Sequence, residues 1–93
     1  MALVTFLGEV RRAAGRPEVE VEAKTVTEAL RSLGAVIGPG FARLLYEDGS
    51  LQPDVEVLVN GRNIEFLREL ETDLEPTDRV TIFYSGVRGF PGG

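Results

Sequence analysis

The chain of 93 residues contains no cysteine and no histidine. Without thiolates and imidazoles, most zinc, haem and iron–sulfur ligation is excluded, and so is nucleophilic catalysis of the Cys–His and Ser–His kinds. An enzyme built on this chain would have to work with carboxylates alone. We therefore expect a protein that is not itself an enzyme and that binds no metal or cofactor.

Long apolar runs and basic stripes are also missing. The longest apolar stretches are a few residues long, far below the roughly 20 that a membrane-spanning helix needs. Met1 opens directly into a strand-like run and not into a signal-peptide pattern. The net charge is −5, and no run of Lys or Arg could neutralise a row of phosphates. We therefore expect a cytoplasmic protein that binds neither membranes nor nucleic acid.

The composition is that of one small globular domain followed by a different segment. Hydrophobic residues make up 43% of the chain and charged residues 27%, so a core can form without disulfides or a structural metal. The last eight residues contain four glycines and no core-like pattern. We accordingly expect a folded domain at residues 1–85 and a flexible C-terminal tail at residues 86–93.

Periodic apolar patterns predict the strands and turns of the domain. Alternating and β-branched runs indicate strands at residues 2–8, 18–23, 55–59 and 79–85, of which the first two form a hairpin. Asn60 and Gly61 supply the positive φ angles of a tight turn.

One main helix is predicted after residue 25. Thr25 and Glu28 have the spacing of a capping box, in which the hydroxyl accepts from the Glu28 amide and the carboxylate from the Thr25 amide. Shorter helical segments are expected at about 41–46 and at 64–70. The side chains expected to point inward are Val26, Ala29, Leu30 and Leu33 in the main helix and Ile64, Phe66, Leu67 and Leu70 in the last segment.

The order strand, strand, helix, strand, short helix, strand is that of a β-grasp. A ferredoxin-like arrangement would need a second long helix before the last strand, and the segment 64–70 is too short for one. We predict an α+β fold of the ubiquitin-like β-grasp class, with a mixed four- to five-stranded sheet packed on one main helix.

Strand alternation also predicts an apolar patch on the open side of the sheet. If Val55, Val57 and Val59 face the helix, Leu58 must face the other way, and so must Phe83. From the first strand, either Leu3, Thr5 and Leu7 or Val4 and Phe6 join them. Such patches usually mark partner surfaces, although single exposed apolar residues are also common. The residues expected to bind a partner are Leu58, Phe83, Leu7 and, in the tail, Phe90.

The tail ends on Gly92 and Gly93, and its chemistry is the chemistry of a terminal carboxylate. Glycine has no Cβ, so a glycine-rich segment can thread a narrow channel that side chains would block. Gly93 then offers an acyl group that a nucleotide-dependent partner could activate. Residues 86–93 contain no phosphate-binding loop, so the nucleotide would come from that partner. The alternative is an ordinary disordered end.

Several segments, taken in order, resemble the MoaD and ThiS sulfur carriers, which include the small subunit of molybdopterin synthase. The resemblance covers nearly the whole chain. It rests on an opening strand followed by Glu9-Val10-Arg11, on Thr27-Glu28-Ala29-Leu30, on Val57-Leu58-Val59-Asn60-Gly61, on the approach from Leu74 to Val80, and on the terminal Gly92-Gly93.

The resemblance implies a specific role for the end of the chain. In that family a ThiF- or MoeB-like activating enzyme, using ATP and a sulfur donor, adenylates the terminal glycine and converts it to a thiocarboxylate. Carried over, Gly93 accepts the sulfur and Gly92 keeps the channel accessible. The sulfur would then pass to a precursor of the molybdenum cofactor, in a complex with the large subunit of molybdopterin synthase.

Other functions remain open from the sequence. Some relatives in this family are protein modifiers, joined through the terminal glycine to lysines of target proteins. The tail of this chain departs from that of the molybdopterin carriers, because it inserts Ser85 to Phe90 before Pro91, and the extra length would suit the modifier role. The sulfur could instead serve thiamin synthesis or tRNA thiolation. A third possibility is a plain β-grasp interaction module whose glycine-rich end has no chemistry.

Overall fold

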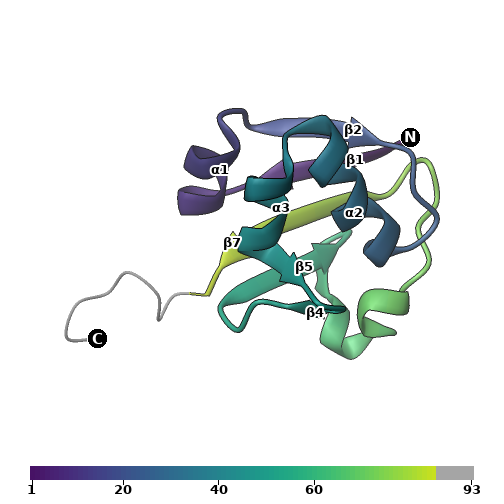
Figure 1. Cartoon of the computed structure of the whole chain (residues 1–93). Helices are drawn as coiled ribbons and strands as arrows, with labels where there is room; N and C mark the ends of the chain where they lie inside the picture. Colours follow the sequence, from purple (N-terminus) through teal and green to yellow (C-terminus); the bar gives the residue numbers. More distant parts are fainter. Residues whose placement is uncertain (86–93) are drawn as a thin grey trace.

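Residues 1–85 are described from a computed structural model of the chain (Figure 1). The expected positions Phe90, Gly92 and Gly93 lie outside these residues, within 86–93. The elements, in chain order, are β1 (Ala2–Phe6), α1 (Gly8–Ala14), β2 (Glu18–Val21), α2 (Val26–Val36), α3 (Pro39–Leu45), β3 (Tyr46–Glu47), β4 (Ser50–Leu51), β5 (Val55–Val59), β6 (Arg62–Asn63), the 3₁₀ turns η1 (Ile64–Phe66) and η2 (Glu69–Glu71), and β7 (Arg79–Tyr84).

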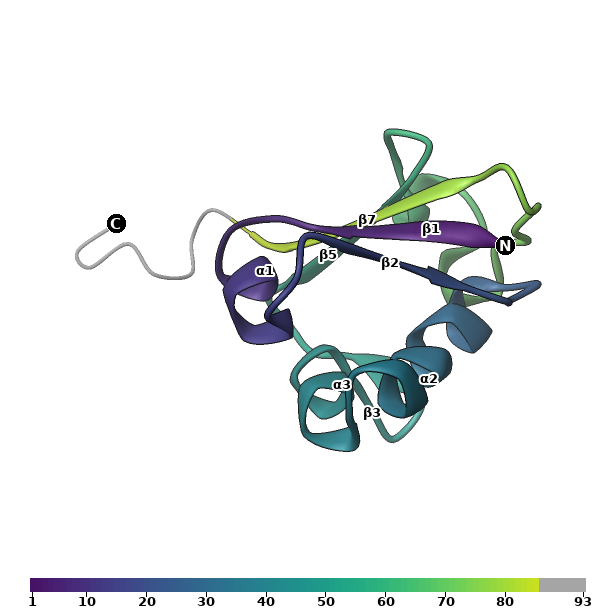
Figure 2. The ribbon, with the colours of Figure 1, turned by 90° about the horizontal axis from the view of Figure 1, so that it is seen from above.

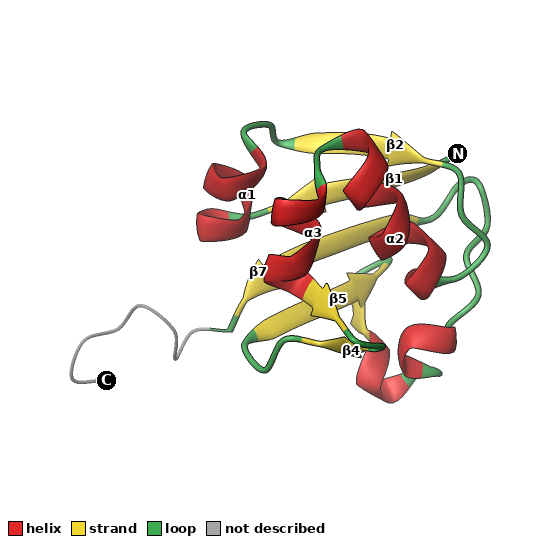
Figure 3. Cartoon of the chain, viewed as in Figure 1, coloured by secondary structure: helices red, strands yellow, loops and turns green. Residues whose placement is uncertain are grey.

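A five-stranded mixed sheet in the order β2-β1-β7-β5-β6 forms the centre of the fold. The two central strands, β1 and β7, are parallel, and the other pairs in this sheet are antiparallel. Strands β3 and β4 form a separate two-stranded hairpin. Helices α2 and α3 pack on one face of the large sheet, and no helix formed by residues 1–85 lies on the opposite face (Figures 2 and 3). This is the predicted α+β β-grasp, with α2 as its main helix.

Helix α2 begins where the capping pattern predicts. The Glu28 amide donates to Thr25 Oγ1 at 3.1 Å, as expected. The second half of the capping box is different, because the Glu28 carboxylate accepts from the Lys24 amide at 2.8 Å and not from the Thr25 amide. The backbone of Thr25 instead forms a bridge with Asp73. The predicted apolar stripe is confirmed, since Val26, Ala29, Leu30 and Leu33 are all buried.

The connection between β1 and β2 contains a helix that was not predicted. The two strands do pair antiparallel, with Val4 opposite Val19, but α1 lies between them. Its Val10 and Ala14 are buried, and Gly15 ends it in the left-handed region (φ 76°), where its amide donates to the Arg11 carbonyl. A seven-residue helix is unstable alone, so packing on the sheet must stabilise it.

The segment 64–70 is also different from its prediction. It forms two 3₁₀ turns and not one helix. Ile64 is buried and Leu67 and Leu70 are half-buried, as expected, but Phe66 is 75% exposed. In a 3₁₀ turn residues three apart eclipse each other, so Ile64 and Leu67 share the inner side and Phe66 points away.

The core fills the space between the helices and the sheet. Its largest fully buried side chains include Phe6 of β1, Leu30 and Leu33 of α2, and Ile82 of β7. The rings of Phe6 and Phe41 meet edge to face, with centroids 5.4 Å apart at 81°, a favoured aromatic geometry. This contact joins α3 to β1. Within residues 1–85, no helix has the length and apolar character to span a membrane.

Candidate functional site

The bare face of the sheet brings the predicted partner-binding residues of the domain together. Val55, Val57 and Val59 are buried toward the helices, so Leu58 lies on the other face, where it is half-buried. In β7, Val80 and Ile82 are buried toward the helices, so the half-buried Phe83 lies on the same face as Leu58. In β1, Val4 and Phe6 are the residues that face the helices, because both are buried in the core. Leu3 and Thr5 are therefore on the bare face.

Strand register places these side chains in adjacent rows. Thr81 is opposite Thr5 on one side and opposite Leu58 on the other. Leu7 stays extended (φ −122°, ψ 153°), and its amide donates to the Ile82 carbonyl at 3.0 Å. It therefore continues the parallel ladder beside Phe83, with 44% of its surface exposed. Leu7, Phe83 and Leu58 form one apolar patch at the end of the sheet where β7 ends.

Charged side chains lie around the apolar side chains of this face. On the edge strand β2, Glu18 lies opposite Thr5 and Glu20 opposite Leu3, and Arg79 of β7 lies on the other side of Leu3. On the other side Glu56 is opposite Phe83, and its carboxylate accepts a hydrogen bond from Asn63 Nδ2 at 2.8 Å. The patch therefore has one carboxylate, Glu56, directly beside it, on a face that carries charges of both signs, which is the pattern of an apolar contact with a polar rim.

The patch lies at the end of the sheet where residues 86–93 begin. Strand β7 ends at Tyr84, and the Ser85 amide donates to the Asp54 carbonyl at 2.7 Å. Phe83 is two residues before that hydrogen bond. Leu7 and Phe83 therefore lie at the same end of the sheet as Ser85, the last described residue.

Thr5 is a residue of the face that was not assigned a role from the sequence. Its Oγ1 atom is buried and has no hydrogen-bond partner within residues 1–85. Strand alternation alone could have placed Thr5 on the bare face, because its neighbour Phe6 is the largest apolar residue of β1 and therefore belongs in the core. Among the same residues, no group of three or more carboxylate side chains is arranged to hold a metal ion.

In the comparison with family models, the model of the ThiS family matches residues 4–85, which is almost the whole described domain. The chain belongs to the ThiS family. Its members are small ubiquitin-like carrier proteins and not enzymes. The predicted relationship to the MoaD and ThiS carriers is thereby confirmed.

Individual relatives agree with this assignment. The chain is 34% identical over 68 residues, 73% of this chain and 77% of the relative, to a protein of Archaeoglobus fulgidus named "Putative sulfur carrier protein". It is 44% identical over 59 residues, 63% of each protein, to small archaeal modifier protein 3 of Haloferax volcanii.

A solved structure gives the same answer for the fold. The solution structure of small archaeal modifier protein 1 from Methanosarcina acetivorans superposes with a TM-score of 0.83 at 29% identity, and the match covers 95% of each chain. This ThiS-family protein therefore has the ubiquitin-like β-grasp fold over its described residues. Relatives of both kinds, carrier and modifier, are among its matches.

Proposed function

We propose that this protein is a sulfur carrier whose Gly93 carboxylate is converted to a thiocarboxylate. The observation that carries the proposal is the ThiS-family match over residues 4–85, followed in the sequence by eight residues that end in Gly-Gly. With no Cys or His in the chain, the acyl group of Gly93 is the group best suited to carry sulfur.

The chemistry needs two steps on an activating enzyme of the ThiF and MoeB kind. A Gly93 carboxylate oxygen attacks the α-phosphorus of ATP, and pyrophosphate leaves, which gives an acyl-adenylate. A hydrosulfide sulfur then attacks the acyl carbon, AMP leaves with the former carboxylate oxygen, and the thiocarboxylate remains. The enzyme binds ATP and the sulfur donor, and the carrier supplies only the acyl group.

The apolar patch supports a mechanism in which the enzyme binds the carrier by its folded domain and acts on its terminal acyl group. Extended, residues 86–93 can reach at most roughly 26–29 Å from Ser85, so Gly93 can enter a deep site while Leu7, Leu58 and Phe83 remain on the partner's surface. Ordering a glycine-rich segment costs conformational entropy, so the patch would supply most of the affinity. A closed channel would also protect the acyl-adenylate from water.

For the sulfur acceptor we propose a precursor of the molybdenum cofactor, with this chain acting as the small subunit beside the large subunit of molybdopterin synthase. The support is the resemblance of its ordered sequence segments to that small subunit. Thiamin synthesis and tRNA thiolation use the same carrier chemistry. Reconstitution with each acceptor in turn, measuring which one gains sulfur, distinguishes them.

A second function, protein modification, shares the first step and is favoured by the 44% identity to small archaeal modifier protein 3. In this case a target lysine amine, and not a sulfur, attacks the acyl-adenylate and forms an isopeptide bond as AMP leaves. Larger covalent species that contain this chain, and that disappear when Gly93 is deleted, would establish that function.

The activation step is tested by isotope exchange between pyrophosphate and ATP on the activating enzyme. We expect exchange that depends on this chain and that is abolished by deletion of Gly93, because the acyl group is then displaced from the reactive position. Undiminished exchange with the deleted chain would contradict the assignment of Gly93. A Thr77→Ala chain, changed at an exposed loop residue, is the control and should support normal exchange.

A further inference from the structure

A second surface of the molecule is a cleft beside the edge of β5 that faces away from β7. The cleft has a volume of about 660 Å³ and is bounded by β4, the loop after it, β5 and the turns η1 and η2. Part of its lining is apolar: Leu51 and Leu70 are half-buried and partly accessible, and Val55, Val57 and Ile64 are buried core residues. The cleft can therefore accept apolar side chains.

One wall of this cleft is an open strand edge. Strand β6 pairs with β5 only through Leu58 and Val59. The part of β5 that lines the cleft, Val55–Val57, has a strand neighbour on the β7 side only, although the Val55 amide already donates to the Gln52 carbonyl at 3.0 Å, so Val57 is the centre of the open edge. An open edge of this kind can pair with an added strand from another molecule.

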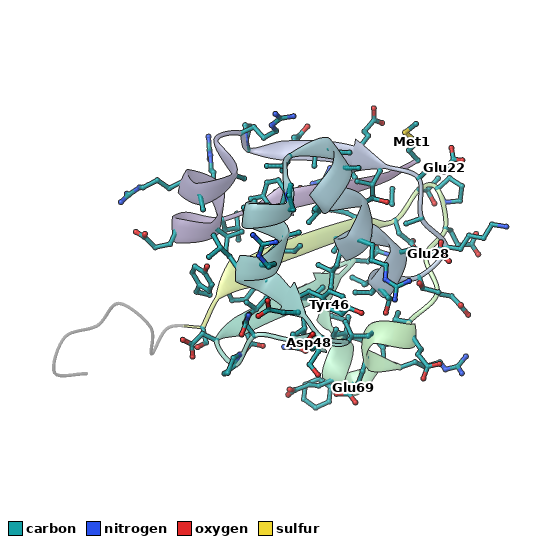
Figure 4. The ribbon with its side chains drawn as sticks, viewed as in Figure 1. Met1, Glu22, Glu28, Tyr46, Asp48 and Glu69 are labelled. Carbon is teal, nitrogen blue, oxygen red and sulfur yellow. The ribbon has the colours of Figure 1, made fainter. Side chains whose placement is uncertain are left out.

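The rim of the cleft is acidic. Glu65, Glu69 and Glu71 line it and are exposed. Their carboxylates form no hydrogen bond or ion pair with any part of the described domain. Arg68 is the one cationic residue in the described lining. Figure 4 shows Glu69 and Asp48, from the turn between β3 and β4, at the same lower edge of the molecule.

We propose that this cleft binds an extended segment of a partner protein in which apolar and basic side chains alternate, added as a strand to the open edge of β5. Successive side chains of a strand point to opposite sides. One set would pack on Leu51 and Leu70, the half-buried apolar residues of the lining, and the other set would reach the free carboxylates of the rim. This surface uses neither the Leu7–Phe83–Leu58 patch nor Gly93, so it does not depend on the proposed carrier function.

Short labelled peptides test the proposal on the full chain by fluorescence anisotropy. A peptide in which valine and lysine alternate should bind. Two variants should bind at least ~10-fold more weakly: one with glutamate in place of lysine, and one with a central proline, which removes a backbone donor. Equal binding of all three peptides, or no binding by the alternating one, would overturn the proposal.

Charge reversal at the rim of the cleft is a second test of peptide binding. The triple variant Glu65→Lys, Glu69→Lys and Glu71→Lys should bind the alternating peptide roughly 10-fold more weakly, since each exposed pair contributes little alone. The matched control reverses three exposed glutamates on and beside β2, Glu18, Glu20 and Glu22, and should bind normally. Circular dichroism checks that both variants are folded.

Backbone chemical shifts locate the bound peptide. Binding should shift the amide signals of Val55–Val57 and Leu70 and leave those of Leu3 and Thr5 unchanged. Shifts confined to the bare face of the sheet would overturn the proposal. So would self-association of the chain without peptide binding, because the cleft would then belong to a second copy.

Discussion

Asn60 ties the hairpin between β5 and β6 to the start of β7. Its backbone is in the left-handed region (φ 52°), and its amide donates to the Arg79 carbonyl at 2.8 Å. Its side chain accepts from the Arg79 amide and donates to Asp78 Oδ1, each at 2.9 Å. One residue therefore provides both the turn and a link across the sequence.

Substitution of Asn60 separates these two contributions. Asn60→Ala should lower the free energy of unfolding by about 2 kcal/mol, because it loses the side-chain hydrogen bonds and disfavours the left-handed backbone. Asn60→Gly should lower it by less, since glycine adopts that backbone readily. Urea denaturation measures both. A glycine variant as unstable as the alanine variant would contradict the backbone part of this explanation.

The turn at Asn60 and Gly61 was predictable because the signal is local, and both φ angles, 52° and 86°, are positive as expected. The hydrogen bond to Asp78 joins residues 18 positions apart. It depends on how β5 and β7 pair, which no local pattern specifies. Phe66 shows the same limit, because its exposure follows from a 3₁₀ geometry that helical spacing did not predict.

At the scale of elements, α1 and α2 show why one helix was predicted and the other was not. Helix α2 has eleven residues, a side-chain cap and a continuous apolar stripe. Helix α1 has seven residues and no side-chain cap. The signals available for α1 were Val10 and Ala14, four positions apart, and Gly15 directly after them. Such a short pattern is also compatible with the turn of a hairpin.

The cap of α2 is tested by Thr25→Ala. Loss of the hydrogen bond from the Glu28 amide to Thr25 Oγ1 should lower the free energy of unfolding by about 1 kcal/mol. The matched variant Thr77→Ala changes an exposed threonine in the loop before β7 and should have almost no effect. Equal effects of the two substitutions in urea denaturation would contradict a specific role of the cap.

At the scale of the whole molecule, strand order brings the predicted partner-binding residues Leu7, Leu58 and Phe83 together. Alternation within strands predicted that Leu58 and Phe83 share the open face, and this is confirmed. Leu7 was expected at the same surface, but alternation within strands does not give the register between them, and the parallel pairing of β1 and β7 is what places Leu7 next to Phe83. That neighbourhood joins residues from both ends of the domain and is a property of the topology.

Charge placed in this patch should weaken docking without unfolding the domain. We expect Phe83→Glu and Leu58→Glu to weaken binding to the activating enzyme at least ~10-fold, because each puts a carboxylate beside Glu56 in an apolar contact. The control Leu44→Glu changes a residue of α3 that is 46% exposed and should bind normally. Isothermal titration calorimetry measures binding, and urea denaturation shows whether the variants fold. Unchanged affinity in both patch variants would show that the partner binds elsewhere.

The central claim, that Gly93 carries sulfur, is tested most directly by intact mass spectrometry of the chain after incubation with the activating enzyme, ATP and a sulfur donor. The account predicts a mass increase equal to the replacement of one oxygen by one sulfur, dependent on ATP, located in the C-terminal fragment and absent when Gly93 is deleted. No such increase with an enzyme that forms the adenylate, or an equal increase in the chain without Gly93, would contradict it.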